Sequence, residues 1–205
     1  MHLAAASQVA NELWLNAPDL SVARLEKHRT MSVLSRIFAR KDPREQASAA
    51  YERVVAMGRD PFWYLDSGVE DSVDGRFEAV ATALCMVLLR LENDDSDPKV
   101  RQFSVHLAEL FVDDMDGQLR QSGVGDLIVG KHIGKMMAAL GGRLGAYRTA
   151  LTTGDGPLLE EALRRNLYRD VPVDDAKVAV SAQRLVEVHR RLAALPLDTI
   201  MQGEF

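Results

Sequence analysis

Residues 77–91 read FEAVATALCMVLLRL, and this stretch decides the fold. Apolar side chains would cover most of the circumference of a helix over this range. That pattern is typical of a helix that is buried on nearly all sides. We therefore expect residues 77–91 to form the central core helix, which begins near Asp74 as its N-cap.

The sequence on either side of this stretch also shows helical periodicity, and no segment alternates apolar and polar residues between hairpin turns. Prolines and glycines divide the chain into further predicted helices over about 34–41, 43–57, 98–121, 126–151, 157–168 and 174–194. The sequence predicts an all-α fold: a single compact multi-helix domain of about seven helices. We expect residues 31–205 to form this domain and residues 1–30 to form a loosely ordered N-terminal extension, with Met31 as a second plausible start.

Composition excludes several classes of protein. Lys and Arg number 25 against 30 Asp and Glu, and the formal charge of −5 argues against a dedicated DNA-binding protein. The longest apolar run is too short to span a bilayer. A single cysteine, Cys85, allows no intramolecular disulfide and is expected to pack in the core.

Residues 31–44 form a basic segment. We interpret it either as a solvated face or as a site that contacts anionic lipid headgroups or ribosomal RNA. The residues of this candidate membrane or ribosome contact are Arg36, Arg40, Lys41 and Arg44.

Asp114 lies on an otherwise apolar stripe of the helix predicted over 98–121. A buried carboxylate needs a partner, because an unpaired buried charge is costly. Arg143 lies at the edge of the apolar stripe of the next helix, so the sequence predicts an ion pair between Asp114 and Arg143. The alternative is that Asp114 is a solvated acid on a slightly rotated helix.

A second stripe on the helix predicted over 126–151 consists of small residues. Each interior glycine costs roughly 0.5–1 kcal/mol relative to alanine, so several on one side require a gain from close packing. Two interpretations stay open: an intramolecular helix crossing, or a groove that receives the helix of a partner. The stripe consists of Gly130, Gly134, Ala138, Gly141 and Gly145.

Motifs for bond-making chemistry are incomplete. Residues 125–131 match the spacing of a phosphate-binding loop, but His132 stands where Ser or Thr should follow the lysine, and no strand precedes the loop. His106 with Glu109 lacks the further ligands of a metal site. We expect no catalytic residues, no cofactor and no metal, and therefore no enzyme.

The run FVDDMDGQLRQSGVGDLIVGKHIGKM over 111–136, continued by Gly142, Arg143 and Tyr147, resembles the signature of the ubiquinol-cytochrome c chaperone family. The resemblance covers about residues 35–170 and includes Tyr51 and the segment Asp74-Gly-Arg-Phe77. The family pattern places partner-binding positions at Asp114, Met115, Asp116, Leu119, Arg120, Gly123, Val124, Asp126, Gly130, Lys131, Lys135, Met136, Gly142, Arg143 and Tyr147, to which the small-residue stripe adds Gly134.

This resemblance implies a helical, non-enzymatic chaperone that helps to assemble the cytochrome bc1 complex and holds newly made cytochrome b. Together with the small-residue stripe, it leads to the hypothesis that a Gly- and Met-lined helical surface binds this client. It implies contacts with the ribosomal tunnel exit and with a small helical partner protein. It also implies peripheral contact with the inner membrane from the cytoplasm, or from the matrix side in mitochondria. The alternative hypothesis is a helical carrier of a small isoprenoid or quinone-like ligand.

Overall fold

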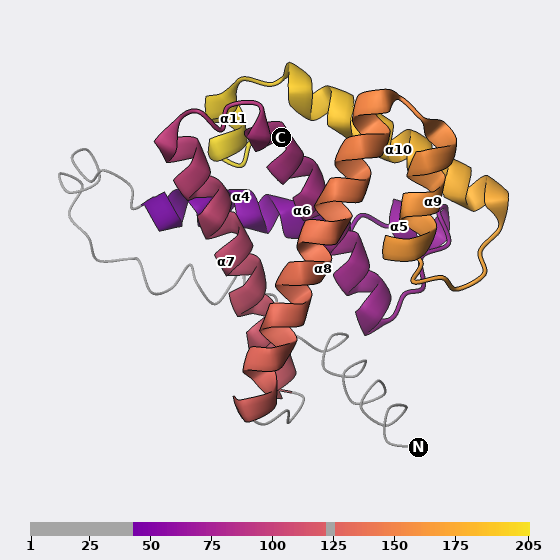
Figure 1. The fold of residues 1–205 in the computed structure, drawn as a ribbon, viewed down its shortest axis with the longest axis horizontal. Helices are drawn as coiled ribbons and strands as arrows, with labels where there is room; N and C mark the ends of the chain where they lie inside the picture. Colours follow the sequence, from indigo (N-terminus) through magenta and orange to yellow (C-terminus); the bar gives the residue numbers. More distant parts are fainter. Residues whose placement is uncertain (1–42, 122–125) are drawn as a thin grey trace.

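The computed structural model describes the backbone over residues 43–121 and 126–205 and the side chains over 44–117 and 137–205 (Figure 1). Within these ranges all regular structure is helical, which confirms the predicted all-α class. The helices are α4 (Pro43–Gly58), α5 (Phe62–Leu65), α6 (Val73–Glu92), α7 (Pro98–Gln121), α8 (Asp126–Thr153), α9 (Gly156–Asn166), α10 (Asp175–Ala194) and α11 (Leu197–Met201).

Helix α6 lies at the centre of the fold, as its sequence predicts. Every residue from Ala79 to Leu91 is buried, and α4, α7, α8 and α10 all pack against this helix. Gly58 at the end of α4 allows one of these contacts, since a Cβ there would lie 2.6 Å from Val80 Cα. The predicted N-cap was wrong: Ser72 caps α6 by accepting a hydrogen bond from Gly75 N, and Asp74 lies in the first turn.

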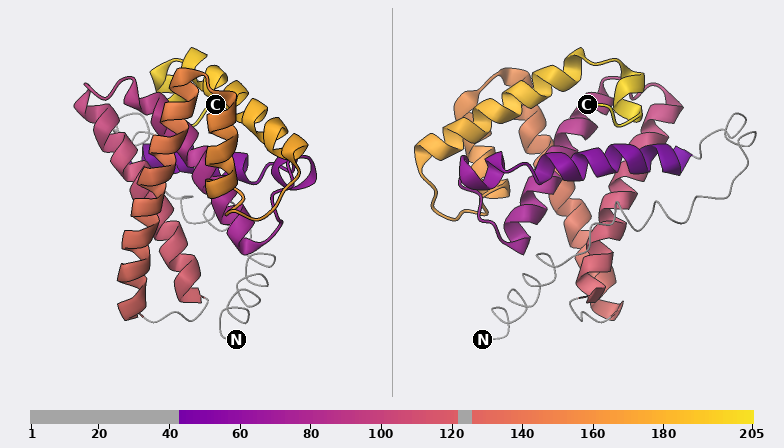
Figure 2. Two further views of the ribbon diagram at one scale, coloured as in Figure 1. Left: turned by 45° about the vertical axis from the view of Figure 1, so that its right-hand side comes forward. Right: turned by 180° about the vertical axis from the view of Figure 1, so that it is seen from behind.

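Helices α7 and α8 form a long pair that runs through the connection at 122–125. Their 24 and 28 residues correspond to helices roughly 36 and 42 Å long. The half of the pair next to the connection projects beyond the other described helices (Figures 1 and 2). The other half packs on the body of the molecule, where α8 contacts α6 and α9 and α7 contacts α4.

Six of the predicted helices are confirmed, with ends that differ by a few residues from the predictions. The sequence analysis did not foresee α5 and α11, which are 4 and 5 residues long and too short to show a helical period. The predicted helix at 34–41, the extension at 1–30 and the joint at 123–125 lie outside the described residues.

None of the described helices combines the length and the apolar character that crossing a bilayer requires. Their buried apolar residues form a single core cluster that includes side chains from α4 to α11.

Candidate functional site

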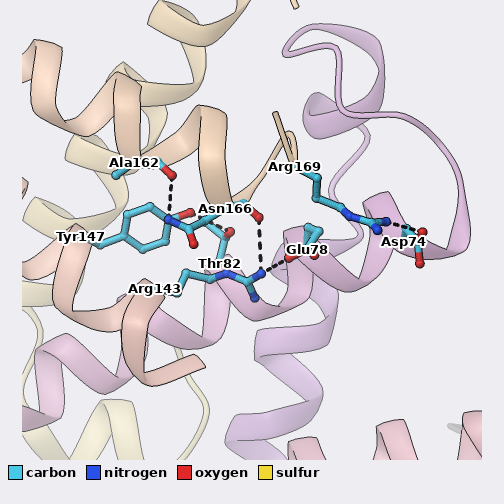
Figure 3. Close-up of polar contacts among 8 residues, drawn as sticks. All are labelled: Asp74, Glu78, Thr82, Arg143, Tyr147, Ala162, Asn166 and Arg169. Carbon is cyan, nitrogen blue, oxygen red and sulfur yellow. Dashed lines mark hydrogen bonds and ion pairs between the residues drawn. The ribbon is translucent and has the colours of Figure 1, made fainter. Parts of the chain in front are cut away.

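A buried polar network joins α6, α8 and α9 at the base of the α7–α8 pair (Figure 3). Arg143 of α8 donates from Nη2 to the Glu78 carboxylate of α6, and the same nitrogen lies 3.4 Å from the backbone oxygen of Asn166. One turn further along α8, the hydroxyl of Tyr147 lies 3.3 Å from Thr82 Oγ1. Two residues of the predicted signature, Arg143 and Tyr147, thus attach α8 to the central helix.

Burial controls the electrostatics of this network. The Arg143 side chain is 6% exposed and that of Glu78 is 9% exposed. Removal from water raises the pKa of Glu78 to about 7, although the positive charges of Arg143 and Arg169 act in the opposite direction. Arg143 also lies over the ring of Phe77, with 5.8 Å between Cζ and the ring centroid, and its Nε has no hydrogen-bond partner among the described residues.

The network continues outward to the loop that follows α9. Arg169 donates to the carboxylate of Asp74 in the first turn of α6 (Figure 3). Arg169 and Asp170 both have positive φ angles, 55° and 58°. Residues other than glycine adopt this backbone conformation with some strain. This contact joins the end of α9 to the start of α6, near Glu78.

A second polar contact fixes α7 to α4. The Tyr51 hydroxyl donates to Asp114 Oδ2 over 2.8 Å, at a half-buried position. Burial, together with the negative charge of Asp114, raises the pKa of Tyr51 above its ordinary value. The prediction that Asp114 has a partner is confirmed, but the predicted partner was wrong, because Arg143 faces α6 and pairs with Glu78.

The small-residue stripe of α8 is open where the structure describes it. Ala138, Gly141 and Gly142 are exposed and Gly145 is half-buried. A Cβ built on any of the three glycines meets no described atom within 4 Å. We call these four residues the small-residue face. An intramolecular crossing at Gly141 and Gly145 is therefore wrong for the described part of the chain, and the neighbouring Met137 is 39% exposed.

The remaining candidate residues divide into three groups. Met115, Arg143 and Tyr147 are buried, with whole-residue exposures of 4%, 5% and 0%, and contact other helices of the chain. Asp114 and Asp116 are half-buried, and Gly142 is exposed. Arg44 is exposed and donates to Asp113 over 2.7 Å.

Other predicted positions lie where no side chain is described. Those that belong to the projecting half of the α7–α8 pair are Leu119, Arg120, Asp126, Gly130, Lys131, Gly134, Lys135 and Met136. Those that fall outside the described backbone are Arg36, Arg40, Lys41, Gly123 and Val124. Their roles stay predictions.

Sequence reasoning missed Glu78 and Thr82, and it named Tyr51 as part of the family resemblance without its contact with Asp114. A signal for Glu78 was present, since a carboxylate inside an almost wholly apolar helix needs a partner as Asp114 does. Among the described residues, no group of three His, Cys, Asp or Glu side chains could hold a metal. His106 lies 3.1 Å from Glu109, one turn along α7, and burial raises the pKa of Cys85 to about 12.

Comparisons with known proteins give a family and a similar fold. Residues 65–205 match the sequence model of the family described as Ubiquinol-cytochrome C chaperone. A solved structure, the crystal structure of the Cbp3 homolog from Brucella abortus, is similar with a TM-score of 0.72 and 26% identity, over 84% of this chain and 94% of that chain. A comparison with curated proteins gives no match.

Proposed function

Because the chain belongs to the ubiquinol-cytochrome C chaperone family, we propose that it is a non-enzymatic assembly factor of the cytochrome bc1 complex and that its client is newly made cytochrome b. The similarity to the Cbp3 homolog over most of both chains supports the assignment. In this proposal the protein shields an apolar segment of the client until its cofactors and partner subunits are in place.

The observation that carries the proposal is the open small-residue face on α8. Glycines inside a helix cost stability, and here no described side chain packs closely on Gly141, Gly142 or Gly145 in return. A helix without side chains on one face lets another helix approach closely, as in membrane helix pairs. The client of this proposal is a membrane protein, whose helices suit such a contact.

Met137 beside this face favours reversible binding. Its side chain is 39% exposed, and the flexible thioether of methionine adapts to apolar surfaces of different shapes. A chaperone must release its client, so adaptable contacts suit the role better than a rigid lock. In the projecting half of the pair, Asp116, Arg120, Lys131 and Lys135 are proposed to form a polar rim that orients the client.

In this proposal the buried contacts at the base of the α7–α8 pair hold the small-residue face in position and do not touch the client. The Glu78–Arg143 ion pair and the Tyr51–Asp114 hydrogen bond fix α8 to α6 and α7 to α4. A binding surface works better on an element that is held in place by its neighbours. We therefore leave Met115, Arg143 and Tyr147 out of the proposed contact surface and assign them to its support.

Substitution of the face tests the proposal. Leucine at Gly141 or Gly145 fills the space that the client would occupy, and no described atom opposes the new side chain. We expect at least about tenfold less cytochrome b to co-purify with tagged Gly141→Leu or Gly145→Leu. Their melting temperatures should stay at or above that of the wild type, because leucine forms helices more readily than glycine.

Ala139→Leu is the matched control. Ala139 is exposed on the same helix but lies roughly 160° around the axis from Gly141 and roughly 120° from Gly145, at about 100° per residue. This variant should capture cytochrome b as the wild type does. Undiminished capture by folded Gly141→Leu and Gly145→Leu would refute the small-residue face as the client surface.

The remaining parts of the proposal concern place and partners. We propose that the protein acts at the periphery of the inner membrane, from the cytoplasm or from the mitochondrial matrix, and that Arg36, Arg40, Lys41 and Arg44 contact the membrane or the ribosomal tunnel exit. A small helical partner protein belongs to the same proposal. No feature of the described residues favours the alternative of an isoprenoid carrier.

A further inference from the structure

A cavity of about 120 Å³ lies between α4 and α10. Both helices pack on α6, which lines the cavity between them with Thr82, Ala83 and Met86. The volume is sufficient for several water molecules. This cavity lies apart from the small-residue face, and no residue of the predicted signature lines it.

Three arginines line the cavity: Arg53 from α4 and Arg184 and Arg191 from α10. The lining contains one carboxylate, that of Asp60, which lies 3.1 Å from Arg184 Nη2. Arg184 Nη1 also lies 3.7 Å from Oε2 of Glu187, a residue that does not line the cavity. The walls therefore carry more positive than negative charge.

Two of these guanidinium groups keep donors available. Arg53 is exposed and uses its Nε to donate to the backbone oxygen of Phe205, and its two terminal nitrogens make no hydrogen bond or ion pair with the described residues. Arg191 makes no hydrogen bond or ion pair with the described residues, and its side chain is exposed at the rim. Positive groups that line one small cavity repel each other unless an anion lies among them.

We propose that this cavity binds an oxyanion of the size of phosphate. A guanidinium group presents donors in a planar fork that matches the oxygens of phosphate, and such charge-assisted bonds are among the strongest in proteins. Trp63 and Met86 contribute apolar walls beside these groups. The proposal does not depend on the chaperone function.

Thermal unfolding of the full chain in rising concentrations of sodium phosphate tests the site, with sodium chloride at equal ionic strength as the reference. Phosphate also stabilises proteins in general by exclusion from their surface, so the comparison is made between variants. Wild type should show a saturable rise in melting temperature. Arg191→Gln and Arg53→Gln should require at least about tenfold more phosphate for the same rise, as expected for loss of one hydrogen bond to a charged group.

Arg190→Gln is the matched control, because it removes the same charge from the adjacent position of α10. Arg190 is exposed and lines a different groove, between α9 and α10. This variant should respond to phosphate as the wild type does. Equal responses in all four proteins would overturn the proposal, since only general stabilisation would then remain.

Vesicles distinguish the two sources of the anion. Phosphatidylcholine vesicles with and without phosphatidic acid are sedimented with wild type, Arg191→Gln and Arg190→Gln. Binding that requires phosphatidic acid and Arg191 supports the site with a lipid headgroup as its ligand. A saturable phosphate response without vesicle binding supports the site with a free phosphate group. Vesicle binding that is the same in all three proteins, without a phosphate response, would overturn it.

Discussion

Replacement of Arg143 by methionine measures how much the ion pair with Glu78 stabilises the attachment of α8 to α6. Methionine keeps much of the apolar length of the arginine stem but removes the charge. The Glu78 carboxylate, in a side chain that is 9% exposed, then stays buried without its cation. Breaking a buried pair in this way costs about 3–5 kcal/mol of unfolding free energy.

The cost should depend on pH, because Glu78 titrates within the accessible range. Its pKa is about 7 with Arg143 in place, and loss of the cation raises this pKa further. At about pH 5 the carboxyl is protonated in both proteins, so the variant loses only hydrogen bonds, worth about 1–2 kcal/mol. At about pH 8.5 the wild type is ionised and paired, so the variant should lose the full 3–5 kcal/mol.

The wild type itself should lose stability as the pH rises. Glu78 has a folded-state pKa of about 7 against an ordinary value of 4.5, so the folded chain holds this proton more tightly than the unfolded chain. The resulting stabilisation is complete below pH 4.5 and is lost as the pH rises through 7. At 1.36 kcal/mol per unit, it amounts to roughly 3 kcal/mol. Glu78→Gln should remove this dependence.

Urea unfolding of the full chain, followed by far-ultraviolet circular dichroism and by tryptophan fluorescence, gives the required free energies where the two probes coincide. The double variant Glu78→Gln with Arg143→Met is the control, and it should recover most of the loss at high pH because no buried charge remains. A loss from Arg143→Met that is below about 1 kcal/mol, or that is equal at both pH values, would refute the reasoning.

Further predictions concern four single positions, namely Gly75, Gly141, Tyr51 and Cys85. Gly75→Ala should lower the melting temperature strongly, since its Cβ would lie 1.9 Å from a backbone oxygen, whereas Gly141→Ala should stabilise by about 0.5–1 kcal/mol. Tyr51→Phe should cost about 1–3 kcal/mol in urea unfolding, because Asp114 loses a hydrogen bond at a half-buried position. The thiol of Cys85, fully buried with a pKa of about 12, should react with maleimide only at the rate of unfolding; rapid labelling of the folded chain would contradict this.

The helices could be predicted from the sequence because a helix period is a local property. The run over 77–91 shows apolar residues around its whole circumference, and the structure buries it on all sides. The short helix α5 gives no such signal. Asp60 and Trp63 hold it, since the Asp60 carboxylate accepts from Phe62 N and the Trp63 indole donates to Met57 O. Such contacts depend on the arrangement of neighbouring segments, which periodicity does not describe.

For the same reason, the sequence showed which buried polar group needs a partner but did not show which residue is that partner. The position of Asp114 on an apolar stripe showed that it needs a partner, and the structure provides one. The identity of that partner depends on how α7 is rotated against α4 and α8. Tyr51 lies 63 positions earlier in the chain, and the sequence around it does not indicate a contact with Asp114. A sequence pattern thus identifies a buried polar group more readily than the group with which it pairs.

The adjacent residues Gly142 and Arg143 show why the signature has to be tested one position at a time. They follow each other in the motif, but a helix turns by about 100° between them, so Gly142 is exposed while Arg143 is buried against Glu78. Loss of client capture in Arg143→Met would therefore report on how α8 is held, and it should be accompanied by the pH-dependent loss of stability. Loss of capture in Gly141→Leu, at unchanged stability, would report on the contact itself. Only the second result identifies the surface that the client meets.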